Sequence, residues 1–219
     1  MTLAVAGVGL FGASVATGPN VEALPATVTA IDAAHNARPV SVSPSDRVAR
    51  AVVAVEDGSF YSHDGIDTLA LLRAAAGFVT GSDSGGSTIE VQLAHLAFPG
   101  PTSGFWGRVH RVTLALQMDT RFTKPAILSM YLDAAYFGHG HYGIVAASRG
   151  YFGVTPSQLS WSQAALLAGL VQAPSSYDPI EHPAAATARR GYVLQRLVAV
   201  GALTQAAADA LAHSPLGAA

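Results

Sequence analysis

A succession of helix patterns, several of them opened by a capping side chain, is the feature that most restricts how this chain can fold. Ser45 and Asp46 precede a stretch in which Val48, Val52 and Val55 recur at helical spacing. The same criteria predict helices over 68–79, 88–97, 106–122, 125–132, 143–152, 160–171, 184–200 and 204–212. We therefore predict a single, mostly α domain.

The residues before this domain divide into two parts. Residues 1–18 are uncharged and largely apolar, and their length approaches that of a bilayer core, so we expect a membrane-anchor helix there. The alternative is a helix that lies in a groove of the protein. Residues 19–44 are rich in Pro, Thr and Val with weak alternation, which predicts an extended linker with one short hairpin. The helical domain then occupies residues 45–213.

Composition narrows the classes of function. Only 12% of the residues are charged and half are hydrophobic, which is lean in charge for a soluble domain and favours membrane contact. Twelve basic against fourteen acidic residues, with no basic cluster, exclude a nucleic-acid partner. The absence of cysteine excludes disulfides and thiolate chemistry.

The segment EDGSFYSHDG, residues 56–65, places two carboxylates directly after the first of these helices. Glu56 and Asp57 fall at the C-terminus of that helix, where backbone carbonyl groups disfavour further negative charge. The preceding valines add desolvation, which raises the proton affinity of a carboxylate in the same way. This setting predicts a carboxyl group adapted to act as an acid or a base.

Four stretches match sequence motifs of one known family. The first motif, E-D-x-x-F-x-x-H-x-G, is filled at every defined position by Glu56, Asp57, Phe60, His63 and Gly65. The second, G-x-S-T-I-x-x-Q, is matched by Gly85, Ser87, Thr88, Ile89 and Gln92. The fourth is matched by Lys124, Ile127, Leu128, Tyr131 and Leu132, and the last by Arg189, Val193 and Leu194. Over roughly residues 40–213 the chain resembles glycosyltransferase family 51, the peptidoglycan glycosyltransferase module of monofunctional transglycosylases and penicillin-binding proteins.

The resemblance implies a lysozyme-like helical domain with a small, membrane-proximal jaw lobe, which would include the apolar helix over 68–79. It implies an enzyme that polymerises lipid II into glycan strands with inversion and releases undecaprenyl diphosphate. The expected partners are lipid II, the growing strand and the membrane, with cell-wall synthases as further candidates. The expected location is the cytoplasmic membrane, with the catalytic domain on the periplasmic or external side.

The chemistry of glycosyl transfer explains the residue types in the motifs. The acceptor hydroxyl must lose a proton as it attacks, and Glu56 is the candidate general base. The departing diphosphate needs cations. The candidate substrate-binding residues are Asp57, Phe60, His63, Ser87, Thr88, Gln92, His95, Arg108, Lys124 and Arg189.

The third family motif, R-K-x-x-E-x-x-x-A-x-x-L-E, is where the chain departs from the family. Its glutamate position, aligned through Ala115 and Lys124, is occupied by Arg111. In one account Arg111 is catalytic and supplies positive charge directly to the diphosphate, so that a divalent cation becomes dispensable. In the other, the donor site is impaired and the protein binds lipid-linked glycan or a partner synthase without turnover.

Two further interpretations come from the residues. A lysozyme-like lytic enzyme would use Glu56 as a general acid on finished glycan. The sequence GHGHYG gives His139 and His141 the spacing of metal ligands, but two flanking glycines favour a surface turn, and we predict the turn.

Overall fold

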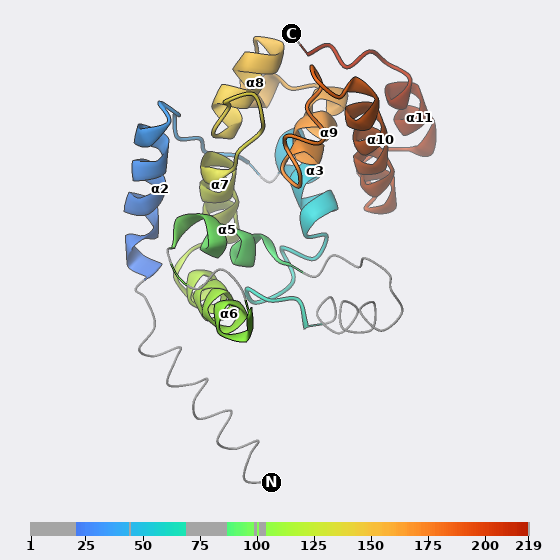
Figure 1. The fold of residues 1–219 in the computed structure, drawn as a ribbon. Coiled ribbons are helices and arrows are strands. Elements are labelled where there is room, and N and C mark those ends of the chain that lie inside the picture. Colours follow the sequence, from blue (N-terminus) through green and yellow to red (C-terminus); the bar gives the residue numbers. More distant parts are fainter. Residues whose placement is uncertain (1–20, 44, 69–86, 99, 101–103, 219) are drawn as a thin grey trace.

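The computed structural model describes residues 21–43, 45–68, 87–98, 100 and 104–218, and it is built of helices (Figure 1). They are η1 (Val21–Ala23), α2 (Leu24–Ala34), α3 (Arg47–Glu56), α5 (Ile89–Ala97), α6 (Gly104–Arg121), α7 (Lys124–Ala134), α8 (Ile144–Phe152), η2 (Pro156–Gln158), α9 (Trp161–Leu170), α10 (Pro183–Ala199) and α11 (Gln205–Ala212). Within these ranges, β pairing is confined to one isolated bridge between Tyr136 and Tyr142. The mostly α fold class is confirmed.

Capping side chains fix where several helices begin. Thr88 accepts a hydrogen bond from the backbone N–H of Val91 and opens α5. Ser160 and Gln163 form a reciprocal capping box at the start of α9. Each of these bonds satisfies an N–H group that has no partner within its helix. The helix starts predicted from these side chains are confirmed.

The extended linker predicted over residues 19–44 was wrong for its central part, which forms α2. Leu24, Val28 and Asp32 recur every four residues and are buried along one face of this helix, which packs against α7. The β-branched Thr and Val residues favoured an extended prediction, but burial of one face outweighs such weak local preferences. Residues 37–43 are not helical, and the N–H groups of Val40 and Val42 bond to side chains of α7.

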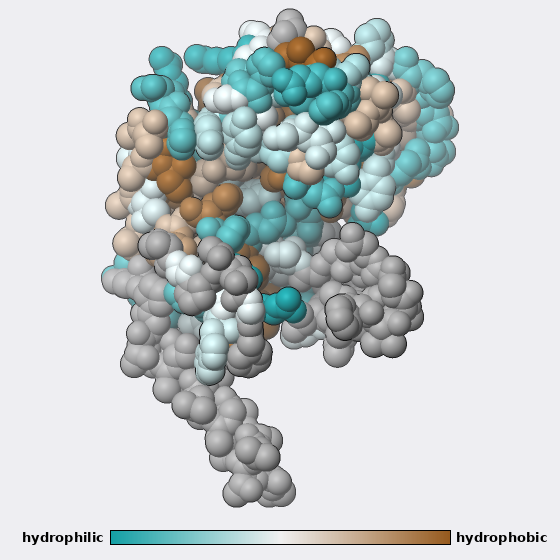
Figure 2. Space-filling view, in the orientation of Figure 1, coloured by the Kyte–Doolittle hydropathy of each residue, from teal (hydrophilic) through white to brown (hydrophobic). Residues whose placement is uncertain are grey.

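Helix α9 forms the centre of one part of the molecule. Its residues from Ala164 to Leu170 are all buried, and both α3 and α10 pack against it. In the other part, α5 packs against α6 and α7, and α7 also contacts α2. A single hydrophobic core joins the two parts. Figure 2 shows apolar residues gathered between α2 and α5 on the viewed face.

Two predicted helices fall on residues outside the described ranges. The anchor over 1–18 lies outside the described residues, and so does the jaw helix over 68–79 apart from Thr68. Of the helices in the described part of the chain, none combines the length and the apolar character needed to cross a bilayer.

Candidate active site

Glu56 is the last residue of α3, and its side chain is held on two sides. The amide Nε2 of Gln92, on α5, donates a hydrogen bond of 3.0 Å to Oε2. The Nη2 atom of Arg189, on α10, lies 3.8 Å from Oε1. Burial raises the pKa of Glu56, and the Gln92 bond and the Arg189 charge oppose that rise. The carboxyl group therefore has a raised pKa, and two neighbours limit how far that pKa rises.

Gln92 is itself held by a buried hydroxyl group. The Tyr131 side chain, on α7, donates a 2.6 Å hydrogen bond to Oε1 of Gln92. Tyr131 is 1% exposed. A chain of two hydrogen bonds thus runs from α7 through α5 to the end of α3. The sequence motifs contained Tyr131 but gave no sign of this contact, because it joins residues 39 positions apart.

The guanidinium of Arg189 contacts two aromatic rings. Its guanidinium carbon is 5.6 Å from the ring centre of Tyr177 and 5.0 Å from that of Tyr192. Its Nε also donates to the carbonyl oxygen of Gly169 at 3.4 Å. Stacking and hydrogen bonding restrict the guanidinium beside Glu56.

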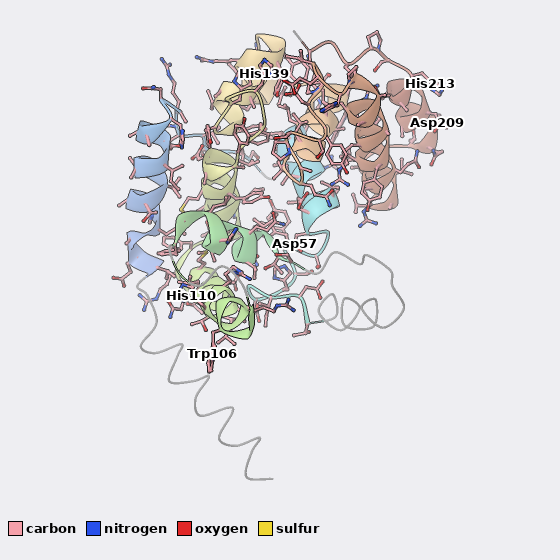
Figure 3. All side chains as sticks on the ribbon, viewed as in Figure 1. Asp57, Trp106, His110, His139, Asp209 and His213 are labelled. Carbon is pink, nitrogen blue, oxygen red and sulfur yellow. The ribbon has the colours of Figure 1, made fainter. Side chains whose placement is uncertain are left out.

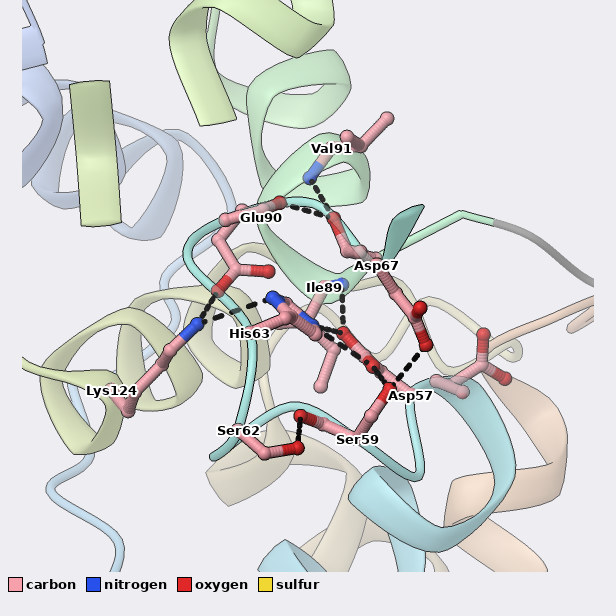
Figure 4. Close-up of polar contacts among 12 residues, drawn as sticks. Asp57, Ser59, Ser62, His63, Asp67, Ile89, Glu90, Val91 and Lys124 are labelled. Atoms are coloured by element: carbon pink, nitrogen blue, oxygen red, sulfur yellow. Dashed lines mark hydrogen bonds and ion pairs between the residues drawn. The ribbon is translucent and has the colours of Figure 1, made fainter. Parts of the chain in front are cut away.

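The Asp57 carboxylate bonds to His63 and to the start of α5. Its Oδ2 accepts from Nε2 of His63 at 2.9 Å and from the backbone N–H of Ile89 at 3.1 Å (Figure 4). Ile89 is the first residue of α5, so the carboxylate lies at a helix N-terminus, where negative charge is favoured. Thr88 donates to the carbonyl oxygen of Gly65. The first and second motifs are thereby tied together.

Lys124 is enclosed by carboxylates in a way that the sequence did not predict. Its Nζ lies 2.6 Å from Oε1 of Glu90 and 2.7 Å from Oδ1 of Asp119. Figure 4 shows the same amine beside His63, 3.5 Å from Nδ1, and it also lies 4.8 Å from the Phe60 ring centre. Burial raises the pKa of Glu90, which the bond from Lys124 opposes. Sequence reasoning missed Glu90 because it occupies a variable position of the second motif.

A cavity of about 510 Å³ opens beside Gln92 and Tyr131. Its lining residues are Ser87, Val91, Gln92, His95, Leu96, Arg111, Tyr131, Ala135, Tyr136, Val171 and Pro174. Four residues predicted for the site, Ser87, Gln92, His95 and Arg111, therefore share one cavity. Its wall is largely apolar, with the guanidinium and the imidazole as its basic groups among these residues.

The remaining predicted residues lie elsewhere. Phe60 is fully buried, Thr88 is buried at its helix start, and Arg108 is exposed on α6. Figure 3 shows Asp57 inside the molecule and Trp106, which belongs to the same helix as Arg108, at its outer edge. None of the three predicted residues, nor Lys124, is among the described residues that line the cavity. Their substrate-binding roles stay predictions.

The GHGHYG segment forms the predicted surface turn. Gly138, His139 and Gly140 have positive φ angles of 84°, 51° and 78°, and the last two are exposed. The His139 ring pairs with Asp178 through a 3.2 Å contact. His139 lies well apart from Asp57 in Figure 3.

Two groups of residues bear on whether the site could hold a metal. Ligand atoms of Asp57, His63 and Glu90 lie within 4.8 Å of one another, but the ammonium of Lys124 already lies against Glu90 and His63. Among the described residues that line the cavity, none is a carboxylate. Hard divalent cations such as Mg²⁺ prefer carboxylate and carbonyl oxygens. The side chains of the described residues that line the cavity therefore do not fit Mg²⁺.

Comparison with known proteins gives several relatives. Penicillin-binding protein 1A of Pseudomonas aeruginosa is 36% identical over 177 residues, which are 80% of this chain and 21% of the relative. A Cupriavidus necator protein named "Putative transglycosylase" is 36% identical over 167 residues, which are 76% of this chain and 72% of the relative. Penicillin-binding protein 1A of Mycolicibacterium smegmatis is 40% identical over 171 residues, which are 75% of this chain and 22% of that protein.

A solved structure and a family model complete the comparison. The 2.6 Å crystal structure of penicillin-binding protein 1A from Haemophilus influenzae matches with 22% identity and a TM-score of 0.49, over 83% of this chain and 18% of that one. The chain spans about a fifth of the length of the penicillin-binding protein relatives. The family model described as Transglycosylase matches residues 26–198. That match covers most of the chain, and with the relative from Cupriavidus necator it shows that the chain belongs to the transglycosylase family.

Proposed function

We propose that this protein is a peptidoglycan glycosyltransferase that polymerises lipid II, with Glu56 as its general base. The observation that carries the proposal is the placement of Glu56. This largely buried carboxyl group accepts a hydrogen bond from Gln92, and Gln92 lines a cavity that Arg111 and His95 also line. A base hydrogen-bonded to one lining residue, with basic groups among the other lining residues, is suited to the transfer of a sugar from a diphosphate.

The proposed reaction is an inverting displacement at the anomeric carbon of the donor sugar. The acceptor hydroxyl oxygen forms the new bond to that carbon, and its proton passes to Glu56. The bond from the anomeric carbon to the phosphate oxygen breaks, and undecaprenyl diphosphate leaves with the electron pair. Each turnover lengthens the glycan strand by one disaccharide.

The surroundings of Glu56 suit a base of this kind. A carboxylate with an ordinary pKa is a weak base, and burial raises the pKa of Glu56. If Glu56 were always protonated, it could not act as a base. The hydrogen bond from Gln92 and the charge of Arg189 both oppose its protonation. The balance favours an anion of increased basicity.

Arg111 and His95 are proposed to receive the diphosphate. Both line the cavity, and a guanidinium can donate two parallel hydrogen bonds to phosphate oxygens. Since no carboxylate is among the described lining residues, we propose that a divalent cation is dispensable. Association with the outer face of the cytoplasmic membrane, and with cell-wall synthases, belongs to the same proposal and follows from the lipid-linked substrate.

The test is polymerisation of purified lipid II by the full chain, with and without a chelator. We expect polymer in both conditions, loss of at least about a hundredfold in rate for Glu56→Gln, and loss of polymer for Arg111→Glu. Glu181→Gln and Arg149→Glu alter exposed residues away from the cavity and serve as matched controls.

Other outcomes identify the alternatives. Because an arginine stands at the family's glutamate position, binding without turnover is the second candidate function. Lipid II that binds to the protein but gives no polymer in any condition would support it and overturn the enzymatic proposal. Release of soluble fragments from purified sacculi would instead indicate a lytic enzyme.

A further inference from the structure

We propose that Tyr131 is a positioning residue, which acts through the Gln92 amide to keep Glu56 in its charged, proton-accepting form. This inference rests on the proposed function, in which Glu56 is the general base. It gives Tyr131, which lies on α7 and matches the fourth family motif, a role in the site.

Tyr131 is the donor in its hydrogen bond with Gln92. The Tyr131 hydroxyl is buried and lies 2.6 Å from Oε1 of Gln92. Burial raises the pKa of Tyr131 well above its ordinary value, and the charge of Glu56 raises it further. The hydroxyl therefore keeps its proton at any working pH and can donate it to the amide oxygen.

The Gln92 side-chain amide has two orientations related by a half turn. In the observed orientation Oε1 accepts from Tyr131 and Nε2 donates to Glu56 at 3.0 Å. Rotation by a half turn would place the amide oxygen against the carboxylate, where two acceptors repel each other. The reversed amide is compatible only with a protonated Glu56. A donor at position 131 thus favours the orientation that suits the anion.

The orientation of the Gln92 amide affects the proton affinity of Glu56. A hydrogen bond donated to a carboxylate favours its charged form and lowers its pKa. At Glu56 this bond is the largest effect that opposes desolvation; the charge of Arg189 acts in the same direction as the bond, and the charge of Asp57 acts against it. Removal of the Tyr131 hydroxyl leaves the Gln92 amide free to reverse. The hydrogen bond that lowers the pKa of Glu56 is then weakened. Glu56 should then hold its proton to higher pH.

The experiment compares the pH dependence of kcat/KM for polymerisation between the wild type and Tyr131→Phe. The base must be unprotonated, so the rate rises with pH through the pKa of Glu56. We expect this rise to move upward by about one pH unit in Tyr131→Phe, with about tenfold lower activity on its acid side and near-normal activity above it. A uniform loss at all pH values, or an unmoved rise, would overturn the proposal.

Tyr151→Phe is the matched control. Tyr151 is also fully buried, but its hydroxyl donates to the backbone carbonyl of Phe137 at 3.1 Å. Deleting it removes a comparable buried hydrogen bond without affecting Gln92. We expect Tyr151→Phe to lose stability but to keep the wild-type pH dependence of kcat/KM. A shift of that dependence equal to the shift in Tyr131→Phe would contradict a specific role for Tyr131.

The effect of Tyr131 on the pKa of Glu56 can also be measured without an activity assay. Carbon-13 NMR titration of the Glu56 carboxyl group, assigned by its absence in Glu56→Gln, should give a higher pKa in Tyr131→Phe than in the wild type. If the wild type makes no polymer, the proposed function fails while this titration still decides the role of Tyr131. If Tyr131→Phe does not fold, Gln92→Met must show the same upward displacement, and its absence would refute the proposal.

Discussion

The ammonium of Lys124 lies 2.6 Å from Oε1 of Glu90, and the side chain of Glu90 is completely buried. Asp119 holds the same ammonium from the other side at 2.7 Å. The motifs made Lys124 a candidate to bind the substrate diphosphate, but its ammonium is already paired with these two internal carboxylates. This pairing makes Lys124 a bridge between α5, α6 and α7, with consequences for stability.

Lys124→Met should destabilise the protein by about 3 kcal/mol, because it leaves Glu90 buried without its counter-charge. Replacing both residues, in Lys124→Met with Glu90→Met, should recover most of that loss. Denaturant unfolding monitored by circular dichroism measures both changes. Arg121→Met is the control, since it breaks an exposed ion pair with Glu22 and should cost less than about 1 kcal/mol. Loss of polymerisation with unchanged stability would restore a direct role for Lys124 at the substrate.

Arg189→Met should raise the pKa of Glu56 by removing a positive charge 3.8 Å from Oε1. The rise of kcat/KM with pH should move upward by about half a unit to one unit. The measurement is the pH profile of polymerisation. Arg149→Met, which removes an exposed arginine of α8, should leave the profile unmoved. A fall in rate of equal size at every pH would instead favour contact between Arg189 and substrate.

Local signals in the sequence predicted most of the fold. Side chains such as Thr88 and Ser160 act on backbone groups three residues away, so the sequence reveals them directly. Helix α2 was missed because its stability comes from burial against α7, about a hundred residues later, and not from local preference. Its β-branched residues pointed to an extended chain.

The site was predictable in part for the same reason. The motif spacing indicated Glu56, Gln92 and Arg111; the last two share the cavity, and Glu56 accepts a hydrogen bond from Gln92. The partners of Lys124 were not predictable, because Glu90 and Asp119 are carried by two other helices. The hydroxyl of Tyr131 was hidden likewise, since only the packing of α7 against α5 brings it to Gln92.

Asp133 should make stability depend on pH. Burial raises its pKa from 3.8 to about 7, the N–H of Val40 partly opposes this, and the nearby charge of Asp32 adds to the rise. Between pH 4 and 7 the folded protein keeps a proton that the unfolded chain has lost. The free energy of unfolding from this group therefore falls as pH increases through that range and is level above it.

Asp133→Asn removes this titration while its Oδ1 can still accept from Val40. We expect the variant to lose less stability than the wild type between pH 5 and pH 8, measured by thermal unfolding at both values. Asp209→Asn, at an exposed position on α11, should keep the wild-type dependence. An identical fall in melting temperature for Asp133→Asn and the wild type would refute the assignment.

Gly169→Ala should reduce activity through the position of Arg189. A Cβ atom at residue 169 would lie 2.9 Å from Cγ of Arg189 and 3.6 Å from Cγ2 of Val193, where α9 and α10 pack closely. The Arg189 side chain must shift, which weakens its contacts with Tyr177, Tyr192 and Glu56. We expect polymerisation to fall about tenfold.

Gly191→Ala, on α10, is the control for Gly169→Ala on α9. No atom lies within 4 Å of a Cβ added there, and Ala favours the interior of α10 over Gly by roughly 0.5–1 kcal/mol. Stability should therefore rise slightly and activity should be unchanged. Measured together by polymerisation and thermal unfolding, the two substitutions separate the placement of the guanidinium from the general effect of a methyl group. Equal activity in both variants would show that the guanidinium of Arg189 tolerates displacement.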